Sequence, residues 1–250
     1  KEGSTAVNSE SPKQAKIRLF RSLFKGREDV YPVRWVSKKT GKSGYSPAVK
    51  DPLRRWRSEQ NGTLNKDPDE YLPLSDHVIQ DHLEGKLVAG IYPLLRDDTC
   101  HFLATDLDGE SHQDDARAFA QVCEELKIPV TIERSRSGNG AHLWIFFEEP
   151  IPAAVARKLG FVILTKAMEK RREITLKSYD RLFPNQDTLP KGGFGNLIAL
   201  PLQREVRDKG GSVFVDPTFR EFSDQWEYLS NVRKMGRAQV EELLATAQQE

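Results

Sequence analysis

The chain has 250 residues, of which 38% are hydrophobic and 30% are charged, and its formal net charge is +1. These values are typical of a globular protein with one large or two small domains, and the net charge alone does not indicate a nucleic-acid partner. No apolar run approaches the roughly 18 residues of a membrane span, and no charged-then-apolar signal segment opens the chain. The two cysteines, Cys100 and Cys123, stand apart in apolar segments, which argues against a disulfide scaffold and favours the cytoplasm.

The N-terminal part of the chain predicts a mixture of helix and strand. Residues 1–13 lack apolar periodicity, and we expect them to form a disordered tail. The spacing of apolar residues then predicts a helix over 14–30. Ser75 is placed to cap a second helix that ends at Gly85, and the segment VAGIYPLL at 88–95 predicts a strand.

Positive charge gathers in one stretch of this part, where Asp51 is the single acid between residues 34 and 57. Trp35, Tyr45 and Trp56 are interleaved with the basic residues. Cationic groups beside aromatic faces suit a strand of nucleic acid, because they engage its phosphates and its bases separately. A solvated basic loop is the alternative. The basic residues are Arg34, Lys38, Lys39, Lys42, Lys50, Arg54, Arg55 and Arg57.

From residue 100 the expected elements follow a regular order. They are a strand at 100–108, a helix from Ser111 to about Lys127, strands at 129–135 and 141–147, a helix from Pro152 to about Arg171, strands near 174–183 and at 196–202, and a helix at 237–248. Asp114 is the expected capping-box partner of Ser111. This order predicts an α+β fold, with an antiparallel or mixed sheet and helices on one face.

Two acids, Asp106 and Asp108, end the apolar strand at 100–108. Positions two apart on a strand share a face, and two carboxylates there repel each other unless a cation lies between them. Mg²⁺ or Mn²⁺, which prefer oxygen ligands, would resolve that repulsion. A plain DLDG turn is one alternative. A phosphohydrolase of the haloacid dehalogenase type is another, although Glu110 stands where that family has Thr or Val.

The segment SRSGNGAHLWIFF at 135–147 predicts a phosphate-binding turn that leads into a strand. Its glycines permit left-handed backbone and a close approach to a ligand, and its amides are candidate donors to phosphate oxygens. His142 follows the turn directly, so we interpret it as a triphosphate contact and not as an ordinary buried histidine. The residues that we assign to the nucleotide in this segment are Arg136, Ser137, Gly138, Asn139 and His142.

A third polar segment, at 184–203, contains Asp187, the glycine-flanked Lys191 and then an apolar strand that ends at Gln203. Lys191 and Gln203 are further candidates for binding the nucleotide. Pro-Lys-Gly-Gly is equally compatible with a plain turn.

Together these motifs resemble the archaeo-eukaryotic primase superfamily, and within it the primase-polymerases of prokaryotic conflict systems and those associated with CRISPR. GIYPLL, SRSGNGAHLWIFF, FPNQDTLP and GFGNLIALPLQ carry the resemblance, which covers about residues 17–230. It implies an RRM-like catalytic sheet beside an N-terminal α/β part. The segments that we expect are a tail at 1–13, an N-terminal subdomain at 14–95, a catalytic subdomain at 96–230 and a C-terminal helix at 231–250.

The resemblance also implies two metal ions, Mg²⁺ or Mn²⁺, held by Asp106, Asp108 and a third acid. In replicative members that acid lies about ten residues before an LIxLP-type strand, and Asp187 lies ten residues before Leu197. We therefore favour Asp187 and keep Asp180 as the second choice. Many relatives carry an N-terminal cysteine cluster, which this chain lacks, so we expect no zinc site.

The function implied by the resemblance is that of a DNA primase-polymerase, which joins nucleoside triphosphates on a DNA template and primer. The expected partners include a helicase, a nuclease or CRISPR-adaptation proteins, and no membrane. Two other hypotheses stay open, namely a metal-dependent phosphohydrolase or nuclease that uses the same acids, and a non-catalytic module that binds single strands. Ribose or deoxyribose preference is left open by the sequence.

Overall fold

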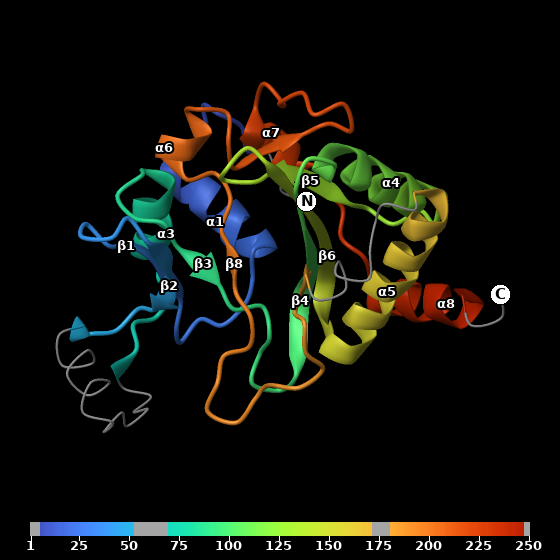
Figure 1. Cartoon of the computed structure of the whole chain (residues 1–250), viewed down its shortest axis with the longest axis horizontal. Helices are drawn as coiled ribbons and strands as arrows, with labels where there is room; N and C mark the ends of the chain where they lie inside the picture. Colours follow the sequence, from blue (N-terminus) through green and yellow to red (C-terminus); the bar gives the residue numbers. More distant parts are fainter. Residues whose placement is uncertain (1–5, 53–69, 172–180, 248–250) are drawn as a thin grey trace, which may run out of the picture.

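The computed structural model describes residues 6–52, 70–171 and 181–247. Its centre is a five-stranded antiparallel sheet (Figure 1), which confirms the predicted α+β class. The strand order is β7 (Leu182–Phe183), β4 (Thr99–Asp108), β6 (Gly140–Pro152), β5 (Thr131–Arg134) and β9 (Val213–Val215). β9, a three-residue edge strand, was not predicted from the sequence.

Helices cover both faces of this sheet, where the sequence predicted one. On one face lie α4 (His112–Glu125), α5 (Ala153–Lys170) and α8 (Arg237–Ala247), seen on the right in Figure 1. On the other face, α1 (Lys13–Leu23) is followed by Phe24, whose ring lies 5.0 Å from that of Trp144 and 5.3 Å from that of Phe146. The first eight residues of β6 are buried without alternation, so this strand requires cover on both sides.

The N-terminal part consists of a hairpin, β1 (Pro32–Val36) and β2 (Ser43–Pro47), and of α3 (Asp76–Leu83). Ser75 caps α3 as predicted, because its Oγ accepts from the Val78 amide. β3 (Gly90–Ile91) pairs with β8 (Ile198–Ala199), so the two halves of the chain share a small sheet. Both strands are shorter than predicted, because only two residue pairs meet.

Three further local predictions differ from the structure. α1 ends at Leu23 and not near residue 30, because the chain bends at Phe24 and then passes close to Tyr92, whose carbonyl oxygen would lie 2.4 Å from a Cβ at Gly26. Ser111 makes no capping hydrogen bond, and its hydroxyl donates instead to Asp115 Oδ2 at 2.7 Å. Residues 6–12, assigned to the tail, contact the protein body, where the Ser9 amide donates to Asp224 Oδ2.

The last helices are short. α6 (Arg204–Arg207) and α7 (Gln225–Ser230) precede and follow β9, and α8 packs on α5 and β6 through the buried Val240. Across the parts of the chain that the structure describes, no helix has the length and apolar character to span a bilayer.

Candidate active site

Asp106 and Asp108 lie at the end of β4, beside the start of β6. The register pairs Asp106 with His142 and Asp108 with Gly140. Asp106 Oδ1 is buried without a hydrogen-bond partner, and His142 Nε2 lies 3.6 Å from it. Asp108 is more exposed and accepts from Arg181 Nη1 at 3.0 Å. The two predicted acids and the predicted histidine therefore lie together at one end of the neighbouring strands β4 and β6.

The charges at this end of β4 favour a bound cation. Burial raises the pKa of Asp106, and the nearby Asp108 charge raises it further, against the lowering effect of His142 and Arg181. An acid with a buried and unpaired oxygen beside a second acid is costly unless a positive ligand compensates it. The donor set, two carboxylates, suits Mg²⁺ or Mn²⁺.

The pair needs another ligand to complete a metal site. Within 6–52, 70–171 and 181–247, no group of three or more His, Cys, Asp or Glu side chains is arranged to hold a metal ion. Asp106 and Asp108 would therefore supply two of the oxygen ligands, and phosphate oxygens of a bound substrate are of the same ligand type.

His142 is held on the side away from Asp106 by a residue that the sequence analysis missed. Its Nδ1 lies 2.9 Å from Glu133 Oε2, and Glu133 on β5 is only 1% exposed. Burial lowers the pKa of His142, but the charge and hydrogen bond of Glu133 and the charge of Asp106 outweigh it and raise the pKa to about 9. A hairpin that turns at 137–138 pairs position 133 with position 142, so the spacing alone could have revealed this partner.

The turn between β5 and β6 brings the backbone against the carboxylates. A Cβ at Gly140 would lie 2.6 Å from Asp108 Oδ1, so a larger residue would displace that acid. Two amides that we expected to face phosphate are used inside the turn, since Gly138 N donates to Ser135 O and Asn139 N donates to Ser137 Oγ. Side chains are therefore the candidate phosphate donors here.

Arg136 is the strongest of these side chains. It is half-buried, and its Nη1 is buried without a hydrogen-bond partner. Burial lowers the pKa of its guanidinium, and the positive charge of Arg34 on β1 lowers it further, against the negative charge of Glu205. Two cationic groups from separate parts of the chain thus lie within electrostatic reach of each other, as an anionic ligand would require.

The hairpin β1–β2 also carries the exposed lysines of the predicted strand-binding region, Lys38, Lys39 and Lys42. None of the three forms an ion pair with a residue that the structure describes. Trp35 beside them is 44% exposed. The predicted contacts Arg54, Arg55 and Arg57 lie outside the described residues.

Asp187 and Lys191 are not brought to the carboxylate pair. β7 runs antiparallel to β4, with Leu182 opposite Thr105 and Phe183 opposite Ala104, so the chain after β7 leads away from Asp106. Asp187 forms an ion pair with Arg157 in the first half of α5.

The loop that follows lies at the start of β4. The Leu189 amide donates to Asp98 Oδ1 at 2.6 Å, and Asp98 precedes Asp108 by ten residues, about 30 Å along a strand. Lys191 is exposed in the next turn of this loop. The second choice for the third acid, Asp180, lies outside the described residues, but Arg181 directly after it contacts Asp108.

Gln203 forms a hydrogen bond within the fold. It is 2% exposed, and its Oε1 accepts from the Val206 amide at 3.2 Å, which caps α6. The expected contact between Gln203 and a nucleotide therefore competes with this capping hydrogen bond.

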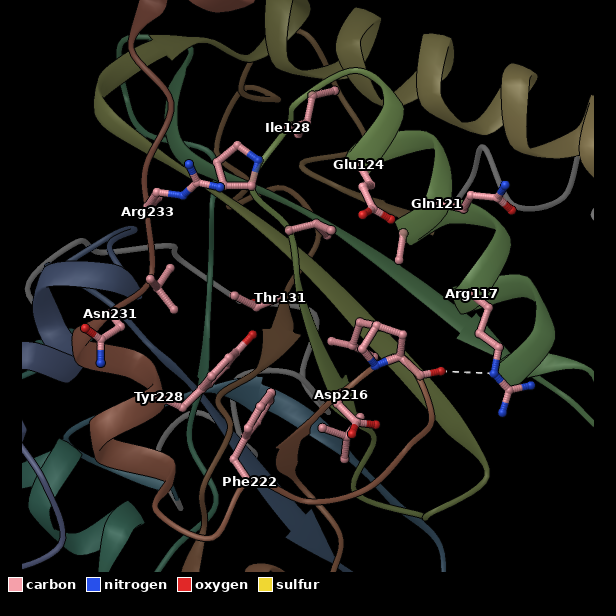
Figure 2. A pocket seen from close by; sticks show the side chains of 17 residues that line it. Arg117, Gln121, Glu124, Ile128, Thr131, Asp216, Phe222, Tyr228, Asn231 and Arg233 are labelled. Atoms are coloured by element: carbon pink, nitrogen blue, oxygen red, sulfur yellow. Dashed lines mark hydrogen bonds between the residues drawn. The ribbon is translucent and has the colours of Figure 1, made fainter.

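A cavity of about 500 Å³ opens elsewhere, at the edge formed by β5, β9, α4 and α7. Arg117, Thr131 and Tyr228 are among the residues that line it (Figure 2). None of the predicted site residues does so. We locate the candidate active site at the end of β4, because Asp106, Asp108 and the buried His142 lie together there.

Comparison with known proteins identifies the family of the chain. Residues 15–243 match the archaeo-eukaryotic primase domain of the TOTE conflict system. The chain belongs to this primase family. That membership confirms the resemblance to primase-polymerases of conflict systems, and it places the protein among nucleotidyltransferases of the primase-polymerase type.

The other comparisons add little. No curated protein matches the chain. Among solved structures, the polymerase domain of Ligase D from Mycobacterium tuberculosis, in complex with DNA, is similar with 14% identity over 95% of this chain and 86% of that chain, at a TM-score of 0.47.

Proposed function

We propose that this primase-family domain catalyses template-directed nucleotidyl transfer from nucleoside triphosphates, acting on a DNA template and primer. The observation that carries the proposal is Asp106, whose buried oxygen has no partner although it faces His142 on the adjacent strand. Evolutionary selection for stability alone would favour a neutral or paired residue there. A buried carboxylate oxygen that makes no hydrogen bond is typical of a functional site.

Asp106 and Asp108 would hold one or both divalent ions, which in a bound state would neutralise charge on the reacting oxygens. We now favour Asp180 as the third acid. Asp180 directly precedes Arg181, which contacts Asp108, so it is close along the chain to a residue of the site. Asp187 is instead paired with Arg157. When a divalent ion binds, Arg181 would be released from its ion pair with Asp108.

His142 and Arg136 would bind the triphosphate. His142 carries a positive charge at neutral pH, because Glu133 raises its pKa to about 9. Its Nε2 lies on the Asp106 side and is free to donate to a phosphate oxygen. Arg136 adds a second cation across from Arg34, so the two side chains would bind the charge of the leaving pyrophosphate.

The hairpin β1–β2 would bind the unpaired template. Trp35 lies over its cross-strand neighbour Gly44, where a Cβ would be 2.9 Å from the indole Cζ2, and the ring stays 44% exposed. Such a supported aromatic face is suited to stack on a base. Lys38, Lys39 and Lys42 would neutralise the adjoining phosphates.

The proposal is tested by incubating the protein with a primed DNA template, nucleotides and Mn²⁺. Extension of the primer is the expected result. Cleavage of the strand would instead support a nuclease, and retention of an unchanged strand would support a binding module. Either of these outcomes, reproduced in the absence of extension, would overturn the proposal.

A further inference from the structure

Glu133 is a buried acid with an unusual set of partners. Its carboxylate accepts three hydrogen bonds, from His142 Nδ1 at 2.9 Å, from Trp144 Nε1 at 2.9 Å and from Ser212 Oγ at 3.1 Å. All three donors are in the core, since Trp144 is 0% and Ser212 is 4% exposed. Glu133 itself contacts neither Asp106 nor the edge of the sheet where a nucleotide would enter.

The three donors come from two separate places in the chain. His142 and Trp144 are adjacent same-face positions of β6, and Ser212 directly precedes β9 on the other side of β5. Ser212 has a φ of 55°, a conformation unfavourable for serine, and its carbonyl accepts from the Leu202 amide at 2.8 Å. The carboxylate is thus fixed from both neighbouring strands.

This geometry leaves the histidine ring one orientation. Because Oε2 of Glu133 accepts from both Nδ1 of His142 and Nε1 of Trp144, rotation of the ring would break a buried hydrogen bond. Nδ1 is the donor to the carboxylate, and Nε2 is left on the opposite side, 3.6 Å from Asp106 Oδ1. Neither an indole nor a hydroxyl requires a charged acceptor, so the negative charge at 133 serves the imidazole.

We propose that Glu133 is a positioning residue for catalysis, which fixes the ring of His142 so that Nε2 faces the phosphates of the incoming nucleoside triphosphate. This inference rests on the proposed function, because it takes the nucleotide to bind at His142. Comparable outer partners of histidine ligands change affinity or activity by about 10- to 100-fold when they are replaced.

The principal test is Glu133→Gln in the full chain, which keeps the size of the side chain but replaces one acceptor by a donor. We expect nucleotide KM to rise and kcat to fall, with kcat/KM lower by about 10- to 100-fold. Ser212→Ala is the matched comparison, since it removes a hydrogen bond from the same carboxylate and leaves the His142 bond. It should lower the melting temperature with a change in kcat/KM under about threefold.

A double variant separates positioning from a general loss of structure. If Glu133 acts through His142, then Glu133→Gln should cause no further loss of kcat/KM in a His142→Ala background. Equal losses in both backgrounds would overturn the inference. So would an effect of Glu133→Gln on kcat/KM no larger than that of Ser212→Ala.

A spectroscopic measurement covers the cases in which Glu133→Gln does not fold or the wild type does not extend primers. Nitrogen-15 NMR of the wild-type imidazoles should show a His142 Nδ1 proton that exchanges slowly with water, because it is buried against Glu133. A His142 Nδ1 without a proton would overturn the positioning role. Absence of extension together with a protonated Nδ1 would instead reject the proposed function and leave the orientation of the ring standing.

Discussion

The two ends of β4 carry acids with opposite surroundings. At its start, Asp98 accepts from the Leu189 amide, and the loop that follows β7 places Asp187 against Arg157. At its end, Asp106 keeps a buried oxygen without a partner, and burial raises its pKa. Asp98 thus contributes to the fold at the start of β4, whereas Asp106 near its end keeps a buried oxygen that makes no hydrogen bond.

This difference teaches how a structural acid is distinguished from a functional one. Asp187 appears in a motif-like segment and at a suggestive spacing, yet its charge is already neutralised by a cation of α5. Asp106 and Asp108 repel each other, and His142 is the nearest positive group for Asp106. The buried Oδ1 of Asp106, which makes no hydrogen bond, joins the motif in marking the end of β4 as the candidate active site.

The largest effect should come from replacing Asp106 and Asp108 together by Ala. Loss of both carboxylates removes the charge that would hold the metal, so we expect incorporation to fall by at least about a thousandfold, or about 4 kcal/mol of activation free energy. Primer extension with Mn²⁺ measures this loss. Comparable extension rates for the variant and the wild type would contradict the placement of the active site at the end of β4.

The next effect concerns the third acid. Asp180→Asn keeps the side-chain volume and removes a charge, and we expect incorporation to fall by orders of magnitude because Asp180 adjoins Arg181 beside Asp108. The variant should also lose most of the Mn²⁺-induced rise in melting temperature. Normal extension by Asp180→Asn would show that the third ligand comes from elsewhere.

Two buried histidines, His82 and His142, have pKa values that are shifted in opposite directions. His82 is neutral, because Nδ1 accepts from the Ala89 amide at 3.1 Å and Nε2 donates to the Pro201 carbonyl at 2.9 Å. Burial lowers its pKa to about 4, below the ordinary value of 6.5.

Since the folded pKa of His82 is the lower one, the unfolded chain binds the proton more tightly. The stabilising effect is complete above pH 6.5 and is lost as the pH falls toward 4, by about 3 kcal/mol. Urea unfolding of the wild type and of His82→Gln between pH 7 and 4 measures the effect, and the variant should show the shallower dependence. Parallel curves would assign the loss to other groups.

The smallest effect should come from Asp187→Asn. Its ion pair with Arg157 is partly exposed, so the free energy of unfolding should fall by less than about 1 kcal/mol. Primer extension should stay within about twofold of the wild type, since Asp187 lies at the other end of β4. A large loss of extension with normal stability would restore Asp187 as a metal ligand.

Much of the catalytic sheet could be predicted from the sequence. The strand at 100–108 is mostly apolar and ends in the acids of Asp106-Leu107-Asp108. The glycine turn before His142 predicts the hairpin whose second strand pairs with it. Local patterns of this kind depend on few residues. The order of the elements predicted an antiparallel or mixed sheet, and the RRM-like arrangement was implied by the family resemblance.

The remaining features depend on contacts between distant parts of the chain. Gly26 lies against Tyr92 soon after α1 ends, and β8 forms only two residue pairs with β3, which lies more than a hundred residues earlier. The direction of the chain after β7 separates Asp187 from the carboxylate pair, and spacing along the sequence does not reveal that direction. Glu133 was missed because an acid in a short strand is usually exposed.

The most direct test of the account is where a divalent ion binds. Mn²⁺ titration, followed by electron paramagnetic resonance of the free ion, can be carried out in parallel on the wild type, Asp106→Asn and Asp187→Asn. The account predicts that the wild type and Asp187→Asn bind Mn²⁺ with affinities within about twofold, whereas Asp106→Asn binds it at least about tenfold more weakly. Weak binding by Asp187→Asn together with wild-type binding by Asp106→Asn would contradict it.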